Sequence, residues 1–91
     1  MTGEKYAVAW TSPAKRALQN LPEKAATAAV EFIYGSLSGN PYLRGKPLRF
    51  ELAGLRSARR GDYRIIYRIN EEQRAIEIVA LDHRSDAYRS R

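Results

Sequence analysis

The chain of 91 residues contains no cysteine and a single histidine, His83. Without cysteine there can be no disulfide bond, thiolate metal site or cysteine nucleophile. The acidic residues do not cluster in a metal-binding pattern, so we expect no metal and no other cofactor. Any acid–base chemistry based on histidine would depend on one side chain. A lone histidine at the end of a strand is more often a structural or surface residue than a catalyst.

Long hydrophobic runs are also absent. No apolar run approaches the ~20 residues that span a membrane. Residues 1–10 lack the basic-then-apolar pattern of a signal peptide. We therefore expect a cytoplasmic protein without a membrane partner, and one domain covering residues 1–91. A domain this small has a thin core, so its functional site should be a shallow groove or an exposed sheet face.

Positive charge, in contrast, is abundant. Sixteen Lys and Arg residues face ten Asp and Glu residues, which gives a formal net charge of +6. This balance favours a polyanionic partner, which could be nucleic acid, an anionic membrane surface or an acidic protein. The simpler alternative is a soluble domain with one charged face.

The N-terminal half has the pattern of a strand followed by two helices. Residues 6–11 predict a short strand, and Ser12 with Pro13 predicts a helix N-cap followed by proline in the first turn. Pro22 ends this helix and can open a second one with Glu23 in its first turn. The predicted inner stripes are Ala14, Ala17, Leu18 and Leu21 in the first helix, and Ala26, Ala29, Val30, Ile33 and Leu37 in the second. The second helix should end between residues 35 and 39, completing a helix hairpin.

The C-terminal half predicts a sheet. Residues 38–47 are rich in Gly, Asn and Pro and predict a loop. Three strands should follow near residues 55–60, 63–70 and 75–81, joined by turns at residues 61–62 and 70–73. Such short connections favour an antiparallel meander. The predicted fold class is therefore α+β, with an N-terminal strand, a helix hairpin and a three-strand meander that form a four-stranded sheet with helices on one face.

The strand at residues 63–70 has an apolar and a basic face. Successive side chains point to opposite sides, so Tyr63, Ile65, Tyr67 and Ile69 share the apolar face. Arg64 and Arg68 lie on the other face, which helices could not cover without burying unpaired charges. We therefore expect an open basic face. Because neighbouring strands lie ~4.8 Å apart, further basic residues could join one patch. The additional residues considered are Arg56, Arg60, His83 and Arg84.

Arginine is well suited to nucleic acid, because its guanidinium forks onto phosphate and stacks on bases. Tyr88 adds an aromatic ring, a combination that suits single-stranded nucleic acid. The alternative is a solvated face whose arginines pair with nearby carboxylates. Composition alone does not establish an enzyme, because arginine stays protonated, tyrosine has a pKa of about 10, and only His83 titrates near neutrality.

Several segments resemble the RelE/ParE superfamily of bacterial toxins, most closely its RelE branch. The first is G-D-Y-R-I-I-Y-R-I at residues 61–69, followed about fifteen residues later by H-R-S-D-A-Y at 83–88. The others are Y-A-V-A-W-T-S-P-A-K-R-A-L-Q-N-L-P at 6–22, N-P-x-x-x-G-K-P-L at 40–48, and A-G-L at 53–55. The resemblance spans nearly the whole chain and implies a single RelE-like toxin domain.

The resemblance implies a toxin of a type II toxin–antitoxin system that is a ribosome-dependent endoribonuclease. Such toxins cut mRNA in the A site through the ribose 2′-hydroxyl without a metal. By position, Arg64 would act on the scissile phosphate, Arg84 would stabilise charge and protonate the leaving oxygen, and Tyr88 would stack on a base and assist the 2′-hydroxyl. The residues expected to bind RNA are Arg56, Arg59, Arg60, Arg68, Lys46 and His83. The implied partners are mRNA, the ribosome and a RelB-type antitoxin, through which the complex would bind operator DNA.

The sequence departs from the RelE pattern in two places. The family carries two lysines on the strand before the turn, whereas L-R-S-A-R-R at residues 55–60 offers Arg56 and Arg59. The spacing from Arg84 to Tyr88 is also shorter. If lysine serves as a general base, arginine would do so less well, and we expect slower or more context-dependent cleavage. The alternatives are a ParE-like inhibitor of DNA gyrase without nuclease activity, and a nucleic-acid-binding module without chemistry.

Overall fold

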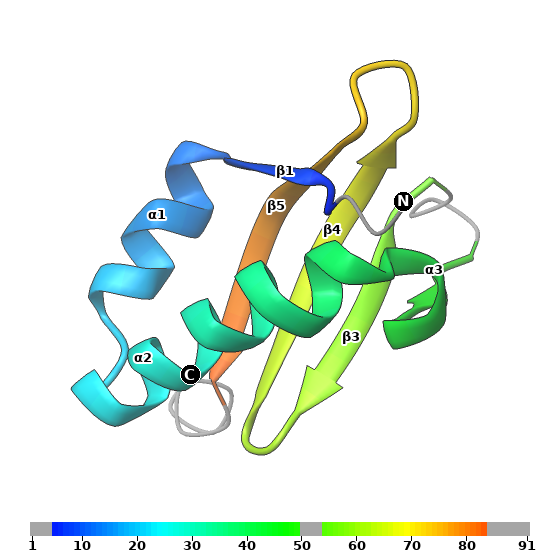
Figure 1. Cartoon of the computed structure of the whole chain (residues 1–91). Helices are drawn as coiled ribbons and strands as arrows, with labels where there is room; N and C mark the ends of the chain where they lie inside the picture. Colours follow the sequence, from blue (N-terminus) through cyan, green and yellow to red (C-terminus); the bar gives the residue numbers. More distant parts are fainter. Residues whose placement is uncertain (1–4, 50–53, 84–91) are drawn as a thin grey trace.

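The computed structural model describes residues 5–49 and 54–83, which form a sheet covered by helices on one side (Figure 1). The elements, in chain order, are β1 (Ala7–Trp10), α1 (Ser12–Gln19), α2 (Glu23–Phe32), the π-helix η1 (Ile33–Leu37), α3 (Pro41–Arg44), β2 (Lys46–Pro47), β3 (Arg56–Arg60), β4 (Tyr63–Asn70) and β5 (Ala75–His83). The predicted α+β class is confirmed. No helix within the described ranges is long and apolar enough to cross a membrane.

The sheet has five strands in the order β1-β5-β4-β3-β2. Strands β3, β4 and β5 form the predicted antiparallel meander, and β1 lies parallel to β5. The fifth strand, β2, and the short helix α3 both lie in residues 38–47, which were predicted to be a loop. The side chain of Asn40 caps α3 by accepting from the Leu43 N–H at 3.2 Å, and Pro41 follows in the first turn. Asn and Pro favour helix starts as well as turns, which explains the difference.

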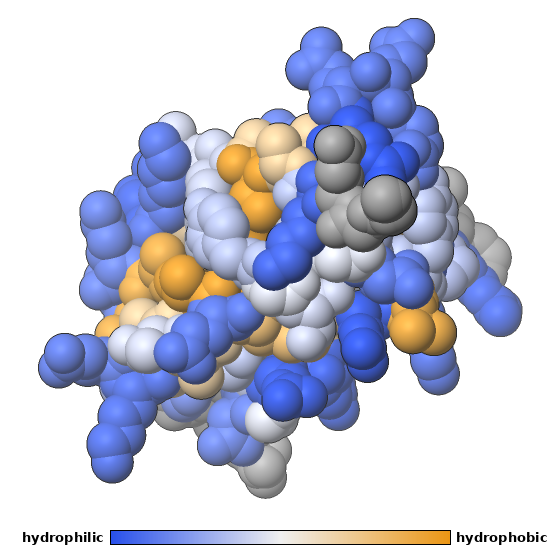
Figure 2. Space-filling view, in the orientation of Figure 1, coloured by the Kyte–Doolittle hydropathy of each residue, from blue (hydrophilic) through white to orange (hydrophobic). Residues whose placement is uncertain are grey.

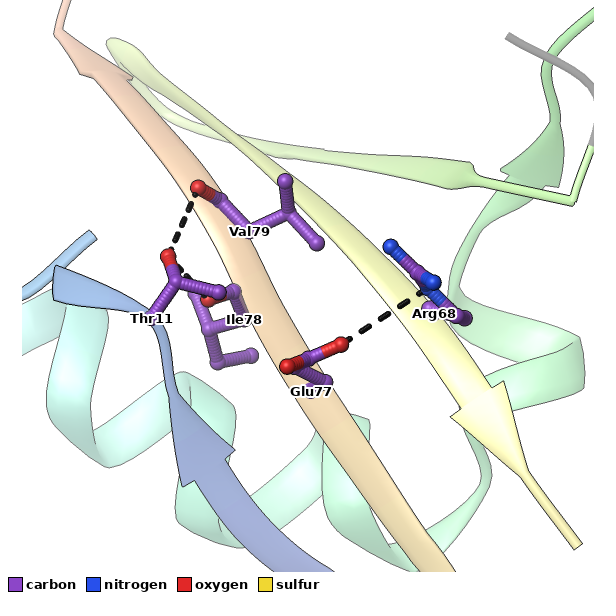
Figure 3. Close-up of polar contacts among 5 residues, drawn as sticks. All are labelled: Thr11, Arg68, Glu77, Ile78 and Val79. Atoms are coloured by element: carbon purple, nitrogen blue, oxygen red, sulfur yellow. Dashed lines mark hydrogen bonds and ion pairs between the residues drawn. The ribbon is translucent and has the colours of Figure 1, made fainter. Parts of the chain in front are cut away.

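Helix α1 is capped one residue earlier than predicted, by Thr11 instead of Ser12. The Thr11 hydroxyl accepts from the Ala14 N–H at 3.2 Å. It also points toward the Ile78 and Val79 carbonyls of β5, each 3.1 Å away (Figure 3). The pairing of β4 with β5 shifts register beside Val79. Thr11 therefore fixes the start of α1 to an irregular point of the sheet.

The core lies between the helices and one face of the sheet. Ile65 and Tyr67 of β4 are fully buried, which confirms the apolar face predicted for this strand. The other fully buried apolar side chains among the described residues are Ala14, Ala29, Ile33, Leu37, Pro41, Ala58, Ile76 and Ile78. From the helical side, the surface is mostly hydrophilic with separate hydrophobic patches (Figure 2). The helices thus turn their apolar stripes toward the sheet, and no helix among the described residues covers its opposite face (Figure 1).

Candidate nucleic-acid interface

Four cationic side chains share the uncovered face of the sheet. Directly paired residues of neighbouring strands project to the same face. Arg59 pairs with Arg64, on the face opposite the buried residues of β4, and Lys46 pairs with Ser57 on that face. Arg68 follows Arg64 at an even spacing along β4 and joins them. We call Lys46, Arg59, Arg64 and Arg68 the basic face, and they confirm that the open side of the sheet is basic.

Two of these arginines have carboxylate neighbours on β5. The Arg64 Nη2 lies 3.5 Å from the Asp82 Oδ2, with 48% and 54% of the two side chains exposed. The Arg68 Nε lies 3.7 Å from the Glu77 Oε1 (Figure 3). Ion pairs this exposed contribute only about 0–1 kcal/mol each, so a phosphate can compete with either carboxylate for its arginine. With four cations against two carboxylates, the open face of the strands keeps a net positive charge.

The two other arginines of β3 lie on the opposite, helix-covered side. Arg56 pairs with Tyr67 and Arg60 pairs with Tyr63, and Ala58 between them is buried. The expectation that Arg56 and Arg60 could join one patch with Arg64 is therefore wrong, whereas Arg59 does share its face. Strand β3 lies near the sheet edge, where long side chains can extend past the helices. The predicted RNA-binding roles of Arg56 and Arg60 stay predictions.

Arg56 binds the protein's own backbone. Its Nη2 donates to the carbonyl oxygens of Tyr42 and Gly45, both at 2.9 Å. Its guanidinium carbon lies 5.4 Å from the centre of the Tyr42 ring, and its Nε is buried without a hydrogen-bond partner among the described residues. The Tyr67 hydroxyl donates to the Pro41 carbonyl at 2.5 Å. Arg56 and Tyr67 together hold residues 41–45 against the sheet, a structural role that sequence reasoning missed.

Gly45 is required by this close approach. A Cβ atom at this position would lie 2.2 Å from the Tyr67 hydroxyl and 2.9 Å from the Ser57 carbonyl oxygen. Burial raises the pKa of Tyr67, with Arg56 opposing the shift, so the hydroxyl stays protonated and can donate at neutral pH. The segment is therefore held by hydrogen bonds from the neutral Tyr67 hydroxyl and the Arg56 guanidinium, and its close packing leaves no room for a side chain at Gly45.

A second set of hydrogen bonds, centred on Glu71, also holds α3 through Tyr42. The Glu71 carboxylate accepts hydrogen bonds from the Tyr42 hydroxyl and, at 2.7 Å, from the Tyr6 hydroxyl. These two bonds hold the pKa of Glu71 below its usual value. They raise the pKa of both tyrosines, because ionising either phenol would break its bond to the carboxylate. Arg74 stacks on the Tyr6 ring, with its guanidinium carbon 4.5 Å from the ring centre.

Of the remaining predicted site residues, the structure describes only His83, which does not share the open face with Arg64. His83 is half-buried at the end of β5 and pairs with Tyr63, which places it on the helix-covered side. Arg84 and Tyr88 lie outside the described residues. Of the three predicted catalytic residues, only Arg64 can be located. Across the part of the chain that the structure describes, no group of three or more His, Asp or Glu side chains is arranged to hold a metal ion.

A family model, similar curated proteins and solved structures all relate this chain to toxins of type II toxin–antitoxin systems. The model of the family described as "ParE toxin of type II toxin-antitoxin system, parDE" matches residues 8–88. Toxin RelE of Mycobacterium tuberculosis is 54% identical over 84 residues, which is 92% of this chain and 87% of that protein. Toxin RelG of the same organism is 51% identical over 84 residues, covering 92% of this chain and 97% of that protein.

Solved structures agree with the sequence matches. The toxin–antitoxin complex RelBE2 of M. tuberculosis contains a chain that is 49% identical, with a TM-score of 0.87, covering 89% of this chain and all of that one. The isolated RelE toxin of Escherichia coli is 14% identical with a TM-score of 0.71, covering 91% of this chain and 90% of that one, and shows the fold alone. The family match and the relatives named Toxin RelE and Toxin RelG show that this chain belongs to the RelE/ParE superfamily, as a RelE-type toxin of a type II toxin–antitoxin system.

Proposed function

We propose that this toxin is a metal-independent endoribonuclease that acts in the cytoplasm, cuts mRNA in the ribosomal A site and so stops translation. The observation that carries the proposal is the exposed pair Arg59 and Arg64, which lie opposite each other on the open face of the sheet. The 54% identity with Toxin RelE supports the same conclusion.

The basic face suits the chemistry of RNA cleavage through the ribose 2′-hydroxyl. The 2′-oxygen forms a bond to phosphorus as it loses its proton, and the bond to the 5′-oxygen breaks as that oxygen gains one. Negative charge builds on the phosphate in between, and fixed guanidiniums stabilise it. Arg64 has the required fork and exchanges the Asp82 carboxylate for the phosphate. Arg59 adds a second positive charge from the neighbouring strand.

Arg84 and Tyr88 complete the proposed site. Arg84 directly follows His83, the last residue of β5, in the chain. In this proposal Arg84 stabilises charge and protonates the leaving 5′-oxygen. Tyr88 stacks on a base of the substrate and assists the 2′-hydroxyl. These roles rest on the family resemblance of residues 83–88.

The proposed protein partner is an antitoxin of the RelB type, through which the complex would bind operator DNA. The support comes from relatives. The similar M. tuberculosis chain belongs to the RelBE2 toxin–antitoxin complex, and a Pyrococcus horikoshii chain at 31% identity belongs to a RelE–RelB complex. A chain with a net charge of +6 also favours an acidic partner.

The test is to map mRNA 5′ ends after adding the purified full-length chain to a translation system. The proposal expects new 5′ ends within the codon in the A site, and none in the same mRNA without ribosomes. The control is a supercoiling assay with DNA gyrase. Gyrase inhibition without new mRNA ends would overturn the proposal in favour of a ParE-like activity. Binding to RNA without mRNA cleavage or gyrase inhibition would also overturn the proposal and indicate a nucleic-acid-binding module without chemistry.

A further inference from the structure

A cavity of about 480 Å³ lies beside the basic face, where α3, β2 and β3 meet. Three of its lining residues are the cations Arg44, Lys46 and Arg59, and Leu43 and Leu48 supply apolar walls. Its described lining contains no acidic residue. Arg44 belongs neither to the basic face nor to the predicted catalytic residues.

We propose that this cavity is a second RNA subsite, which holds the backbone phosphate of a nucleotide next to the cleaved bond. Arg44 and Lys46 bind the phosphate, and Leu43 and Leu48 pack against the nucleoside. The inference rests on the proposed function, because it takes single-stranded RNA as the ligand. It adds a site whose role is to hold the substrate strand in place.

Charge distribution favours an anion in this cavity. On the neighbouring strand β4, Arg64 and Arg68 each face a carboxylate of β5. The cavity instead combines three cations without an acidic side chain in its described lining. Such a concentration of charge is stabilised by an anionic ligand. A phosphodiester adds the apolar contact of its nucleoside, which matches Leu43, a side chain left 66% exposed.

The cavity is continuous with the predicted cleavage site. Lys46 lies opposite Ser57 on β3, and Arg59, two residues further along β3, lies opposite Arg64 on β4. Strands in a sheet lie ~4.8 Å apart, so β2 and β4 are separated by roughly two such spacings. An RNA strand that crosses the open face from Arg64 reaches the cavity within a nucleotide or two. This continuity favours RNA over an acidic protein segment as the occupant.

The wall that carries Arg44 and Lys46 is held in place before any ligand arrives. Arg56 donates to the Tyr42 and Gly45 carbonyls, and Tyr67 donates to the Pro41 carbonyl. The wall is therefore fixed at both ends of α3. A site that is already ordered loses less conformational entropy on binding. Arg56 acts as a positioning residue for this subsite, from the side of the sheet away from the RNA.

The experiment measures how salt affects RNA binding. The probe is a labelled single-stranded RNA whose riboses all carry 2′-O-methyl groups, which removes the attacking hydroxyl. Binding to the full-length chain is followed by fluorescence anisotropy over a series of salt concentrations. Each phosphate contact contributes about 0.7 to the slope of log K against log salt for a single strand. We expect Arg44→Ala and Lys46→Ala each to weaken binding and reduce the slope by about that amount.

Matched variants separate the subsite from general charge effects. Lys15→Ala removes an exposed cation from α1, on the helical side, and should leave the slope unchanged. Arg44→Lys should keep the slope, because lysine still binds phosphate as a point charge. Arg44→Gln, close in size to the native side chain, repeats the test should the alanine variant unfold on heating earlier than the wild type.

The outcomes for the subsite and for the proposed function are distinct. Slopes for Arg44→Ala and Lys46→Ala that match the wild type would overturn the subsite, even if the wild type cuts mRNA. Unchanged RNA slopes together with weaker binding of a polyglutamate peptide would assign the cavity to a protein partner and also overturn it. Reduced slopes without any mRNA cleavage by the wild type would support the subsite and refute the proposed nuclease.

Discussion

The arginines of the β3–β4 hairpin form two groups with different environments. Arg59 and Arg64 lie opposite each other on the open face, where Arg64 meets an exposed carboxylate. Arg56 lies on the helix-covered face, where it binds two backbone carbonyls and stacks on Tyr42. The two groups alternate within a few residues of sequence. The face on which an arginine lies, more than its membership of a basic strand, therefore determines what it can bind.

Energetics separate the groups in the same way. An exposed ion pair such as that of Arg64 contributes about 0–1 kcal/mol to folding. A hydrogen bond that involves a charged group contributes about 1.5–3 kcal/mol, and Arg56 donates one exposed and one part-buried bond of this kind. Substitutions on the open face should therefore change activity with little effect on stability. Substitution of Arg56 should mainly lower stability.

The largest expected effect is on toxicity. We expect Arg64→Ala and Arg84→Ala each to abolish growth arrest when the chain is expressed in bacteria, because each removes a guanidinium from the proposed reaction. The free energy of unfolding of Arg64→Ala should stay within about 0.5 kcal/mol of the wild type, since the side chain is exposed. Growth curves and urea titration check the two parts. A stable Arg64→Ala chain that still arrests growth fully would refute the assignment.

Arg56→Ala should have the largest effect on stability. It leaves the Tyr42 and Gly45 carbonyls without their donor, and we expect a loss of about 2–3 kcal/mol in the free energy of unfolding. Urea denaturation measures it, with Arg59→Ala on the open face as the matched control. Equal stabilities for the two variants would contradict the division of roles between the faces.

Gly45→Ala tests the close contact beneath α3. The added Cβ would overlap the Tyr67 hydroxyl, and such overpacking costs about 1–3 kcal/mol. In a Tyr67→Phe background, where the hydroxyl is absent, the cost of Gly45→Ala should be smaller. A double-mutant cycle by urea denaturation measures this coupling. Strictly additive costs would show that the two residues are not in contact.

The smallest expected effect concerns pH. The pKa of Glu71 is lowered in the folded state, so its contribution to stability is present above the usual value of 4.5 and is lost as the pH falls through the lower, folded value. Glu71→Gln cannot titrate. Between neutral pH and about pH 3, the wild type should therefore lose more stability than Glu71→Gln, when both are measured by urea denaturation at each pH. Parallel pH profiles would contradict the tie to Tyr6 and Tyr42.

Sequence patterns predicted the elements whose residues alternate clearly. In β4, four apolar residues at even spacing predicted which side chains lie on each face. Two apolar stripes separated by Pro22 predicted the two helices. In contrast, L-R-S-A-R-R at residues 55–60 has no such stripe: Ala58 alone marks the inner face of β3. The sides of Arg56 and Arg59 therefore became clear only from the register with β4.

Other features depend on contacts between distant parts of the chain. The parallel pairing of β1 with β5, the contact of Thr11 with Ile78 and the approach of Gly45 to Tyr67 each join segments more than twenty residues apart. No local pattern predicts such contacts. The short elements α3 and β2 are also too brief for periodicity to identify, so the cavity between them could not be foreseen.

The most direct test of the basic face is the single-turnover rate of mRNA cleavage on ribosomes with an empty A site. With Arg64→Ala, we expect the rate to fall about 10²–10³-fold, as it does when a donor to a developing negative charge is removed. Lys15→Ala, on the helical side, should cleave at the wild-type rate. An Arg64→Ala rate within a few-fold of the wild type would contradict the claim that this face acts on the phosphate.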